Sequence, residues 1–447
     1  MKPYTKYKNL TTEELLNLRY KKSYILGIIL RRFFRQLICG DFSEKKDFIC
    51  YLKNTFLYHR HSLNCKSRVF FDPICKYLMD EDYKKNKLWL SKQPEEFLSK
   101  PTEVFIFSNH PAYVTGGGQR YTQLAKGFCA LGKKVHYLYC QSFEDILLDE
   151  NNSLGYLHQA IYTIGIDEAF ANVTKDTLCI FEMPHQDFIP WLMEAKKRKL
   201  KTVYEQIDNW DTSLGKTFYN KENFQIYLDN CEHLVVTSKN LSELLIPYTK
   251  KAISYIPNAV DDNVFAPNRI YEKPSDMVTG SKTVLYFGAL ARDWIDWELI
   301  TQTADLCKDC SFIMIGDNSS DLLDDIASSH PNIHFIGAKQ QRDLPAYLAY
   351  SDCAIIPFKV DDTGKYVSPI KIFEYLSMRV HVLTTPMPDI AGYPNTFISG
   401  SAKEWANDIL TFVKPIETSA INEINTRLDS FIDSNNWIAR CKTLLDL

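Results

Sequence analysis

Short apolar runs alternate with helical patterns from about residue 103 to residue 380, and this alternation predicts an α/β fold. The runs that we expect to be buried strands are 104–107, 134–138, 177–181, 201–204 and 233–237 in a first series, and 283–287, 312–315, 333–336 and 353–358 in a second. Helical patterns separate them, including 119–131, 188–199, 294–307, 321–328 and 344–350. Strands that alternate with helices indicate parallel sheets covered on both faces, with ligands bound beyond the carboxyl ends of the strands.

The chain of 447 residues is too long for one hydrophobic core, so we expect several parts. The expected parts are a basic, mainly helical extension over 1–100, a first α/β domain over 101–265, a second over 266–425, and a final helix over 426–447. The boundary between the α/β domains is placed at 254–267, where proline, asparagine and aspartate interrupt the apolar pattern. Two similar α/β domains are expected to face each other across a central cleft.

The composition is that of a soluble globular protein without a strong overall field. The chain is 45% hydrophobic, and its net charge of −3 gives no reason to expect nucleic-acid binding. Its 12 cysteines show no repeated spacing, and Cys307 and Cys310 lack a second pair that would complete a zinc site. We therefore expect no metal and a cytoplasmic protein with reduced thiols. No signal peptide is expected, because the first apolar run, 24–30, is too short to span a bilayer.

Positive charge is concentrated in the first hundred residues. They carry 21 Lys and Arg against 11 Asp and Glu, a balance of +10, which leaves −13 for the rest of the chain. Thr11–Glu14 has the form of a capping box and predicts a helix through 25–37, where arginines interrupt apolar residues. Such a helix would suit a peripheral contact with the anionic inner face of the cell membrane. The alternative is that its apolar face packs on the neighbouring domain.

Residues 366–376 carry the most specific chemistry of the chain. Ser368, Pro369 and Ile370 stand at the expected start of a helix, where free backbone N–H groups and the helix dipole favour an anion such as phosphate. Lys371 and Glu374 are three residues apart and share a helix face. An ammonium beside a diphosphate and a carboxylate beside sugar hydroxyls would suit a sugar nucleotide. An i,i+3 ion pair on a solvated helix is the structural alternative.

Two loops after expected strands are also candidates for phosphate binding. Gly117 and Gly118 end a glycine triplet before a helix, where backbone can approach a ligand closely, although a tight turn would explain them equally. Gly288 opens the loop after the strand 283–287, and this loop would aim Arg292 at a diphosphate. A surface ion pair is the alternative for Arg292.

Polar residues follow two further strands at their carboxyl ends. Glu182 and His185 come after the strand 177–181, and Glu205 and Asp208 come after the strand 201–204. Carboxylates and imidazoles at such ends are candidates for acid–base chemistry or for contacts with sugar hydroxyls. A hydrogen-bonded loop histidine or a capping aspartate is the structural alternative in each case.

Taken together and in this order, the motifs identify a resemblance that covers roughly three quarters of the chain. They are GGQRYTQLA at 117–125, IPNAVD at 256–261, YFGA at 286–289, NIHFIG at 332–337 with LPAYL at 344–348, and SPIKIFEY at 368–375. The chain from about residue 103 resembles the GT-B glycosyltransferases of the family 4, or group 1, type, which include bacterial cell-surface polysaccharide and teichuronic-acid enzymes. The first hundred residues resemble nothing that we recognise.

The resemblance implies two Rossmann-like domains and an enzyme of the hexosyltransferase class. Such an enzyme moves a hexose from a nucleoside-diphosphate sugar, with UDP or GDP, to a glycan, lipid-linked or protein acceptor, usually with retention and with neither cofactor nor metal. It also implies a final helix that crosses back to the first domain, with Trp437 as an anchor; a plain surface helix is the alternative. The product would belong to a cell-envelope polysaccharide or glycoconjugate.

The resemblance also implies roles for particular residues. The catalytic set is His185, Arg292, Lys371 and Glu374, and the donor-binding set is Gly117, Gly118, Gly288, Arg292, Ser368, Pro369, Ile370, Lys371 and Glu374. Glu182, Glu205 and Asp208 are candidates for contacts with the acceptor or the sugar. Arg292 and Lys371 would lie near the diphosphate, Glu374 near the ribose hydroxyls and His185 near the hexose.

Two departures from the family pattern keep other functions open. In the first loop of the second domain, Arg292 alone represents the family's usual arginine and lysine, and it is displaced along the loop. The family has a pair of glutamates eight residues apart; Glu374 matches the second, whereas Tyr366 stands in place of the first, with Asp361 and Asp362 nearby. A catalytically silent GT-B scaffold that binds sugar nucleotide or glycan is therefore one alternative. A nucleotide-sugar 2-epimerase of the same fold is another. Turnover with a defined acceptor would separate all three.

Overall fold

The computed structural model describes residues 73–447 except 113–117, 141–154, 213–214, 216–217, 291–293, 318–319, 362–363 and 413–418, together with a few residues before 73. Gly117, Arg292, Asp362 and the expected capping box at 11–14 lie outside the described residues. Before residue 73, the described residues include the π-helix η1 (Phe33–Ile38), which overlaps the end of the expected basic helix. Within the described part of the chain, no helix is both long enough and apolar enough to cross a bilayer.

The chain groups into two compact units, and each unit is built from three separate segments of the sequence. The first unit holds residues 1–114, 132–202 and 217–230, and the second holds 115–131, 203–216 and 231–447. The second unit therefore contains helix α7 (Arg120–Ala130) and the whole of the second sheet.

The first sheet has seven strands in the order β3-β2-β1-β4-β5-β6-β7. Their bounds are β1 (Val104–Ser108), β2 (Val135–Tyr139), β3 (Leu157–Ala160), β4 (Leu178–Phe181), β5 (Lys201–Gln206), β6 (His233–Val236) and β7 (Ile253–Tyr255). Pairs such as β1 with β2 and β1 with β4 are parallel. Strand β1 is buried along its whole length, and Phe107 stacks on Phe181 of β4 at 4.4 Å between ring centroids. Burial on both faces explains why its sequence is a continuous apolar run.

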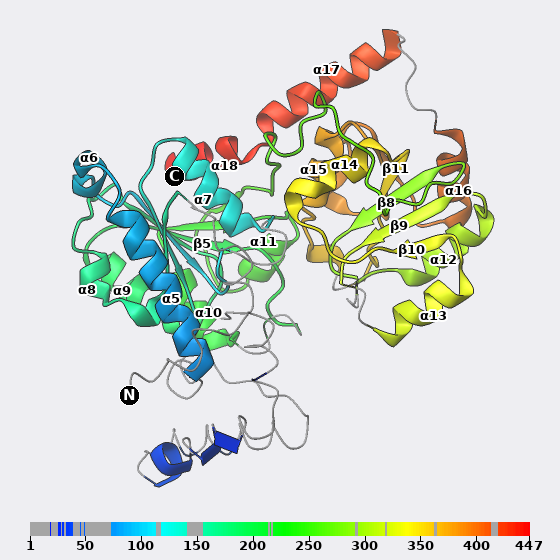
Figure 1. Ribbon diagram of the computed structural model, residues 1–447. Coiled ribbons are helices and arrows are strands. Elements are labelled where there is room, and N and C mark those ends of the chain that lie inside the picture. Colours follow the sequence, from blue (N-terminus) through cyan, green and yellow to red (C-terminus); the bar gives the residue numbers. More distant parts are fainter. Residues whose placement is uncertain are drawn as a thin grey trace. The chain divides into compact units, whose positions relative to one another are not determined.

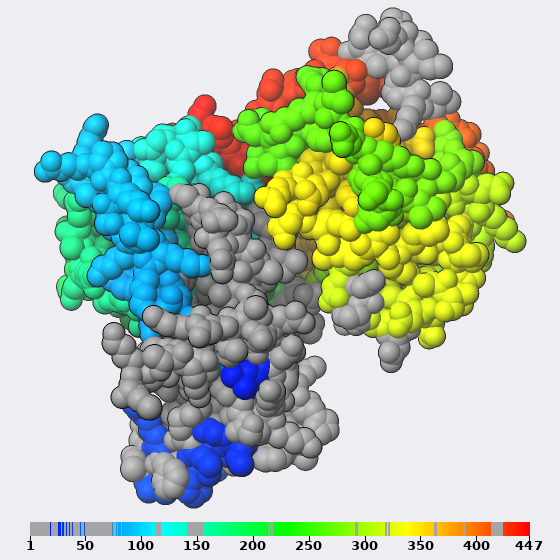
Figure 2. All heavy atoms as spheres, in the orientation of Figure 1, coloured from blue at the N-terminus to red at the C-terminus, as the bar shows by residue number. Residues whose placement is uncertain are grey.

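Helices connect and cover these strands (Figure 1). They are α5 (Pro73–Leu90), α6 (Glu95–Ser99), α7, η2 (Ile161–Thr163), α8 (Ile166–Ala169), η3 (Gln186–Phe188), α9 (Ile189–Lys197), α10 (Lys221–Asn230) and α11 (Leu241–Leu245). Helix α5 packs beside β3 and lies at the surface of the first unit, light blue in Figure 2. The segment before residue 100, which was expected as a basic extension, therefore contributes helix α5 to the first unit.

The second sheet has six strands in the order β10-β9-β8-β11-β12-β13. Their bounds are β8 (Thr283–Phe287), β9 (Ser311–Ile315), β10 (Ile333–Phe335), β11 (Cys353–Ile356), β12 (His381–Thr384) and β13 (Thr396–Ile398). The strand order reverses between β8 and β11, which makes their carboxyl ends a topological switch point where α/β sheets bind ligands.

The helices of the second sheet lie on both of its faces, as right-handed crossovers require (Figure 1). They are α12 (Trp297–Leu306), α13 (Asp321–Ser329), η4 (Gln341–Asp343), α14 (Leu344–Ala349), η5 (Gly364–Tyr366), α15 (Lys371–Ser377), η6 (Pro388–Ile390) and α16 (Ala402–Thr411). Helix α16 packs against α12, and α15 packs against α17 (Ser419–Ser434).

The last helix, α18 (Trp437–Leu445), packs against α7 within the second unit. Trp437 is buried, and a Cβ added at Gly127 would come within 2.7 Å of Cys441 Sγ. Gly127 therefore allows the two helices to approach closely, because any larger residue would push them apart.

The predicted parallel α/β architecture is confirmed, and every predicted strand is present within a few residues of its expected bounds. Strands β3, β7, β12 and β13 and helix α5 were not predicted. The expected domain exit at 254 instead begins inside β7. Strand β3 escaped the apolar pattern because it buries two polar side chains that are hydrogen-bonded: Gln159 contacts His136 at 3.1 Å, and the Nε2 of His158 accepts from the Ala112 N–H at 2.9 Å.

Candidate functional site

A cavity of about 160 Å³ lies in the second unit, beyond the carboxyl ends of β8 and β11. It is lined by Tyr286, Ala289, Trp294, Phe358, Val367, Pro369 and Lys371 around the second sheet, and by Asp208, Asn209 and Thr212 from the loop after β5. Three of these ten residues are aromatic, and one lysine and one aspartate are the charged groups. This composition suits a ligand with both flat apolar faces and polar groups.

Lys371 is held in this cavity by aromatic rings. Its Nζ lies 4.8 Å from the ring centroids of both Tyr286 and Phe358, and it donates to the Tyr286 hydroxyl at 3.5 Å. No carboxylate among the described residues lies within the 4.0 Å that defines an ion pair with its ammonium. Burial lowers the pKa of Lys371 to about 8, although the charge of Glu374 opposes this shift. Within the described part of the chain, its ammonium is thus desolvated without an ionic partner, and an anionic ligand would relieve this state.

Gly288 brings the backbone close to Lys371. Its φ is +141°, a conformation that favours glycine, and a Cβ added there would lie 3.1 Å from Lys371 Nζ and 3.2 Å from the Tyr286 hydroxyl. The structure therefore brings together Gly288 and Lys371, two of the predicted donor-binding residues. Tyr286 and Phe358 complete this part of the wall and were not predicted as site residues.

Glu374 lies one helical turn after Lys371, but its hydrogen-bond partner comes from elsewhere. Gln341 Nε2 donates to Glu374 Oε1 at 3.0 Å, and Glu374 is 5% exposed. Burial raises the pKa of Glu374 to about 7, and the hydrogen bond from Gln341 and the charge of Lys371 oppose this shift. The alternative of an exposed i,i+3 ion pair is wrong, because Glu374 is buried and is bonded to Gln341.

The helix that carries these residues begins later than expected. Helix α15 starts at Lys371, and Ile370 occupies the N-cap position with helical dihedral angles and no side-chain cap. Ser368 and Pro369 precede it, and the Ser368 carbonyl accepts from Asn258 Nδ2 at 2.7 Å. The expectation that Ser368 and Pro369 start the helix is therefore wrong by about two residues, because Ile370 is the N-cap residue and the first helical residue is Lys371.

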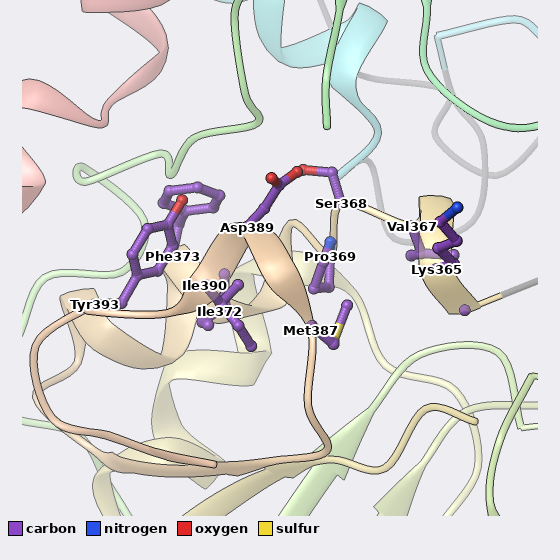
Figure 3. A pocket seen from close by; sticks show the side chains of 11 residues that line it. Lys365, Val367, Ser368, Pro369, Ile372, Phe373, Met387, Asp389, Ile390 and Tyr393 are labelled. Carbon is purple, nitrogen blue, oxygen red and sulfur yellow. The ribbon is translucent and has the colours of Figure 1, made fainter. Parts of the chain in front are cut away.

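A second, smaller cavity lies beside Ser368 and Pro369 (Figure 3). It is lined mostly by apolar side chains, including Ile372, Met387 and Ile390, with Asp389 among its charged residues. Its volume is only about 10 Å³, which is roughly the space of one water molecule and too small for a diphosphate. The cavity with Lys371 is therefore the better candidate for an anionic ligand.

Glu205 has a structural partner that the sequence did not reveal. Arg120 donates to both of its carboxylate oxygens, from Nη2 at 2.7 Å and from Nε at 3.2 Å, and both side chains are nearly inaccessible. Arg120 Nη1 also donates to the Pro257 carbonyl at 3.1 Å and to Asn258 Oδ1 at 3.2 Å. This geometry supports the structural alternative for Glu205. Asp208, in contrast, lines the cavity with Lys371.

Glu182 and His185 lie in the first unit, after β4. Both are buried, and His185 Nδ1 accepts from the Asp187 N–H at 3.1 Å, which caps η3. Its ring packs near Phe188 and Phe218. The capping bond fixes the orientation of the imidazole ring.

Gly118 is the described end of the predicted glycine loop. A Cβ added there would lie 3.0 Å from Gln341 Nε2, so its backbone packs against the amide that holds Glu374. Gln341 and Arg120 are the polar residues that sequence reasoning missed. The signal for Arg120 was a charged residue at the start of a helix that is otherwise buried; no comparable signal marked Gln341.

Comparisons with known proteins support the resemblance inferred from the motifs. Residues 281–414 match the family described as Glycosyl transferases group 1. A protein of Bacillus subtilis (strain 168), named for a glycosyltransferase role in teichuronic acid biosynthesis (TuaH), is 22% identical over 153 residues. That match covers 33% of this chain and 38% of the B. subtilis protein, so the chain spans well under half of that relative's length in the match.

Solved structures share the fold at low sequence identity. Anabaena HepE in complex with UDP and glucose has a TM-score of 0.57 at 14% identity, covering 77% of this chain and 98% of HepE. The apo lipopolysaccharide outer core galactosyltransferase WaaB has a TM-score of 0.50 at 12% identity, covering 77% of this chain and 99% of WaaB. These neighbours are GT-B glycosyltransferases, so the predicted GT-B fold is confirmed.

Proposed function

We propose that this chain, with its GT-B fold and its match to the group 1 glycosyltransferases over residues 281–414, transfers a hexose from a UDP-sugar to a glycan or lipid-linked acceptor. The product would belong to a cell-surface polysaccharide or glycoconjugate, as the name of the B. subtilis relative suggests. UDP is the proposed nucleotide because the HepE structure contains UDP and glucose.

The observation that carries the proposal is the environment of Lys371. A desolvated ammonium without a carboxylate partner within 4.0 Å among the described residues costs stability, and a diphosphate would supply the missing negative charge. A cavity of about 160 Å³ beside Lys371, with three aromatic side chains in its walls, offers space for such a ligand. This segment lies inside the family match.

The proposed chemistry needs no nucleophile from the protein. The bond from the anomeric carbon to the diphosphate oxygen breaks, a bond from the same carbon to the acceptor oxygen forms, and the acceptor proton passes to the leaving phosphate. Attack on the face that the diphosphate leaves gives retention. Lys371 stabilises the charge that develops on the leaving diphosphate, and such fixed positive charge is typically worth roughly two to three orders of magnitude in rate.

The other candidate residues have subordinate proposed roles. Glu374 would accept from ribose hydroxyls, and the backbone at Gly288 would allow the diphosphate to approach Lys371. Asp208 would contact the transferred sugar or the acceptor, since it lines the same cavity. His185, Gly117 and Arg292 keep the roles that the resemblance implies, and the basic segment 1–100 would keep the protein near an anionic membrane.

A panel of nucleotides tests the donor site. Unfolding midpoints are measured for the wild type, Lys371→Met and the control Lys359→Met with UDP, GDP, ADP, CDP and their glucose or mannose conjugates. Lys359 is a suitable control because its side chain is exposed next to the same strand end. At one hundred times the dissociation constant, a ligand adds about 2.7 kcal/mol, or roughly 5–10 °C for a domain of this size.

We expect UDP and UDP-sugars to stabilise the wild type and Lys359→Met, but not Lys371→Met. Stabilisation of Lys371→Met to the same extent would refute the assigned donor site. Release of UDP from UDP-glucose that requires a glycan acceptor separates a transferase from the alternatives. An epimerase would change the sugar without an acceptor, and a silent scaffold would bind UDP-glucose and leave it intact.

A further inference from the structure

Gln341 occupies a position between three elements of the second unit. It lies at the start of η4 and is 6% exposed. Its Nε2 donates to Glu374 Oε1 at 3.0 Å, and its Oε1 accepts from Gln123 Nε2 of α7 at 3.0 Å. The backbone of Gly118 packs against the same amide, because a Cβ added there would lie 3.0 Å from Nε2.

These hydrogen bonds have a fixed direction when Glu374 is ionised. An ionised carboxylate can only accept, so Gln341 must present its NH₂ group to Glu374. Its carbonyl oxygen must then face Gln123, which in turn must present its own NH₂ group. The chain Gln123 to Gln341 to Glu374 therefore selects one amide orientation and holds one carboxylate oxygen, Oε1, in place.

We propose that Gln341 is a positioning residue that holds Glu374 as an ionised acceptor for the ribose hydroxyls of the sugar nucleotide. This inference rests on the proposed function for the identity of the ligand. With Oε1 engaged by Gln341, Oε2 of Glu374 is the oxygen that accepts from the ligand. The contact of the amide with Gly118 also ties the position of this carboxylate to the end of the glycine loop.

The charges around Glu374 show why a hydrogen bond from Gln341 is needed to keep the carboxylate ionised. Lys371 favours the ionised carboxylate, whereas Asp261 and above all burial disfavour it. With a pKa of about 7, Glu374 is near the point where it loses its charge at neutral pH. The hydrogen bond from Gln341 favours the charged form, so its loss would move this titration to higher pH.

The first test uses the apo protein and needs no ligand. Unfolding midpoints are compared for the wild type, Gln341→Leu and the matched control Gln340→Leu from pH 5.5 to pH 9; Gln340 is the exposed neighbour. Loss of the hydrogen bond raises the folded-state pKa of Glu374, so Gln341→Leu should be destabilised more as pH rises through about 7. In a Glu374→Gln background, the same substitution should have an effect that does not change with pH.

The second test measures the hydroxyl contact directly. The dissociation constants of UDP and 2′,3′-dideoxy-UDP are determined at pH 8 for the same variants. We expect the wild type and Gln340→Leu to prefer UDP at least tenfold, and Gln341→Leu to prefer it less than threefold, because a hydrogen bond to a charged group is typically worth such a factor. A structural role for Gln341 would weaken both nucleotides equally.

The outcomes distinguish this inference from the proposed function. If Gln341→Leu keeps the full preference for UDP, or if its destabilisation is the same from pH 5.5 to pH 9, Gln341 does not hold Glu374 and the inference is wrong. If the wild type binds neither nucleotide, the proposed UDP-sugar function fails, and the apo measurement alone decides whether Gln341 holds Glu374 ionised.

Discussion

Two cations of the second unit, the buried Arg120 and the partly buried Lys371, have opposite environments. Arg120 meets both oxygens of Glu205 and two further acceptors, so its guanidinium is fully engaged by the protein. Lys371 meets two aromatic rings and one hydroxyl at 3.5 Å, with no described carboxylate within 4.0 Å. Both are desolvated, but one has all its charge partners inside the chain.

The difference indicates that Arg120 stabilises the fold and that Lys371 is available to bind an anionic ligand. In a buried ion pair with bidentate geometry, the hydrogen bonds within the pair already offset the desolvation of both charges, so no ligand is needed. A desolvated ammonium that has no carboxylate of the described residues within ion-pair distance has a lowered pKa, and such a group is typical of functional sites. Glu205 was expected in the site and belongs to the first kind, whereas Lys371 belongs to the second.

Breaking the satisfied pair should have the largest effect on stability. Arg120→Met leaves Glu205 as an uncompensated buried charge, which typically costs about 3–5 kcal/mol in the free energy of unfolding. Urea denaturation at pH 7 measures this cost. The double variant Arg120→Met with Glu205→Leu should recover part of it, because no buried charge is then left alone. Equal stability of Arg120→Met and wild type would show that the pair is not structural.

A smaller effect is expected when the approach to Lys371 is narrowed. Gly288→Ala places a Cβ about 3.1 Å from Lys371 Nζ and forces alanine to a φ of +141°, so it should weaken UDP binding and cost roughly 1–3 kcal/mol of stability. Gly132→Ala is the matched control, since Gly132 also has a positive φ, +73°, with nothing within 4 Å of an added Cβ. We expect Gly132→Ala to lose some stability and to bind UDP normally. Equal UDP affinities for the two variants would argue against a diphosphate at Gly288.

The smallest effect concerns pH. With a pKa of about 8, Lys371 is charged below that value, so UDP affinity of the wild type should fall about tenfold per pH unit above it. Its folded-state pKa is below the value of 10.5 for an unfolded lysine. It therefore contributes apo stability that is present above pH 10.5 and lost as pH falls through about 8.

Titration calorimetry between pH 7 and pH 9.5 checks the binding limb, and Lys371→Met should show no such limb. The apo wild type should also gain stability relative to Lys371→Met as pH rises from 8 to 10. An identical pH dependence of the two proteins would assign the titration to another group.

The apolar runs were enough to predict most strands of both sheets, because buried parallel strands such as β1 and β8 consist mainly of apolar residues. Strand β3 was missed because it carries buried His158 and Gln159, whose hydrogen-bond partners lie far away in sequence. The prediction of the site residues succeeded and failed for the same reasons as the prediction of the strands. The spacing of Lys371 and Glu374 predicted a shared helix face, but the partner of Glu374 is 33 residues away and that of Glu205 is 85 residues away. Such partners depend on tertiary packing and leave no local pattern.

The unfolding midpoint of Lys371→Met in urea at pH 7, measured without and with saturating UDP, decides whether Lys371 binds the donor or supports the fold. A methionine removes the unpaired charge and keeps much of the side-chain volume, so the apo variant should be as stable as the wild type or more stable, on the order of 1–3 kcal/mol. It should also gain nothing from UDP, whereas the wild type gains several kcal/mol at high UDP concentration. A variant that loses stability as Arg120→Met does, and is still stabilised by UDP, would show that Lys371 supports the fold and does not bind the donor.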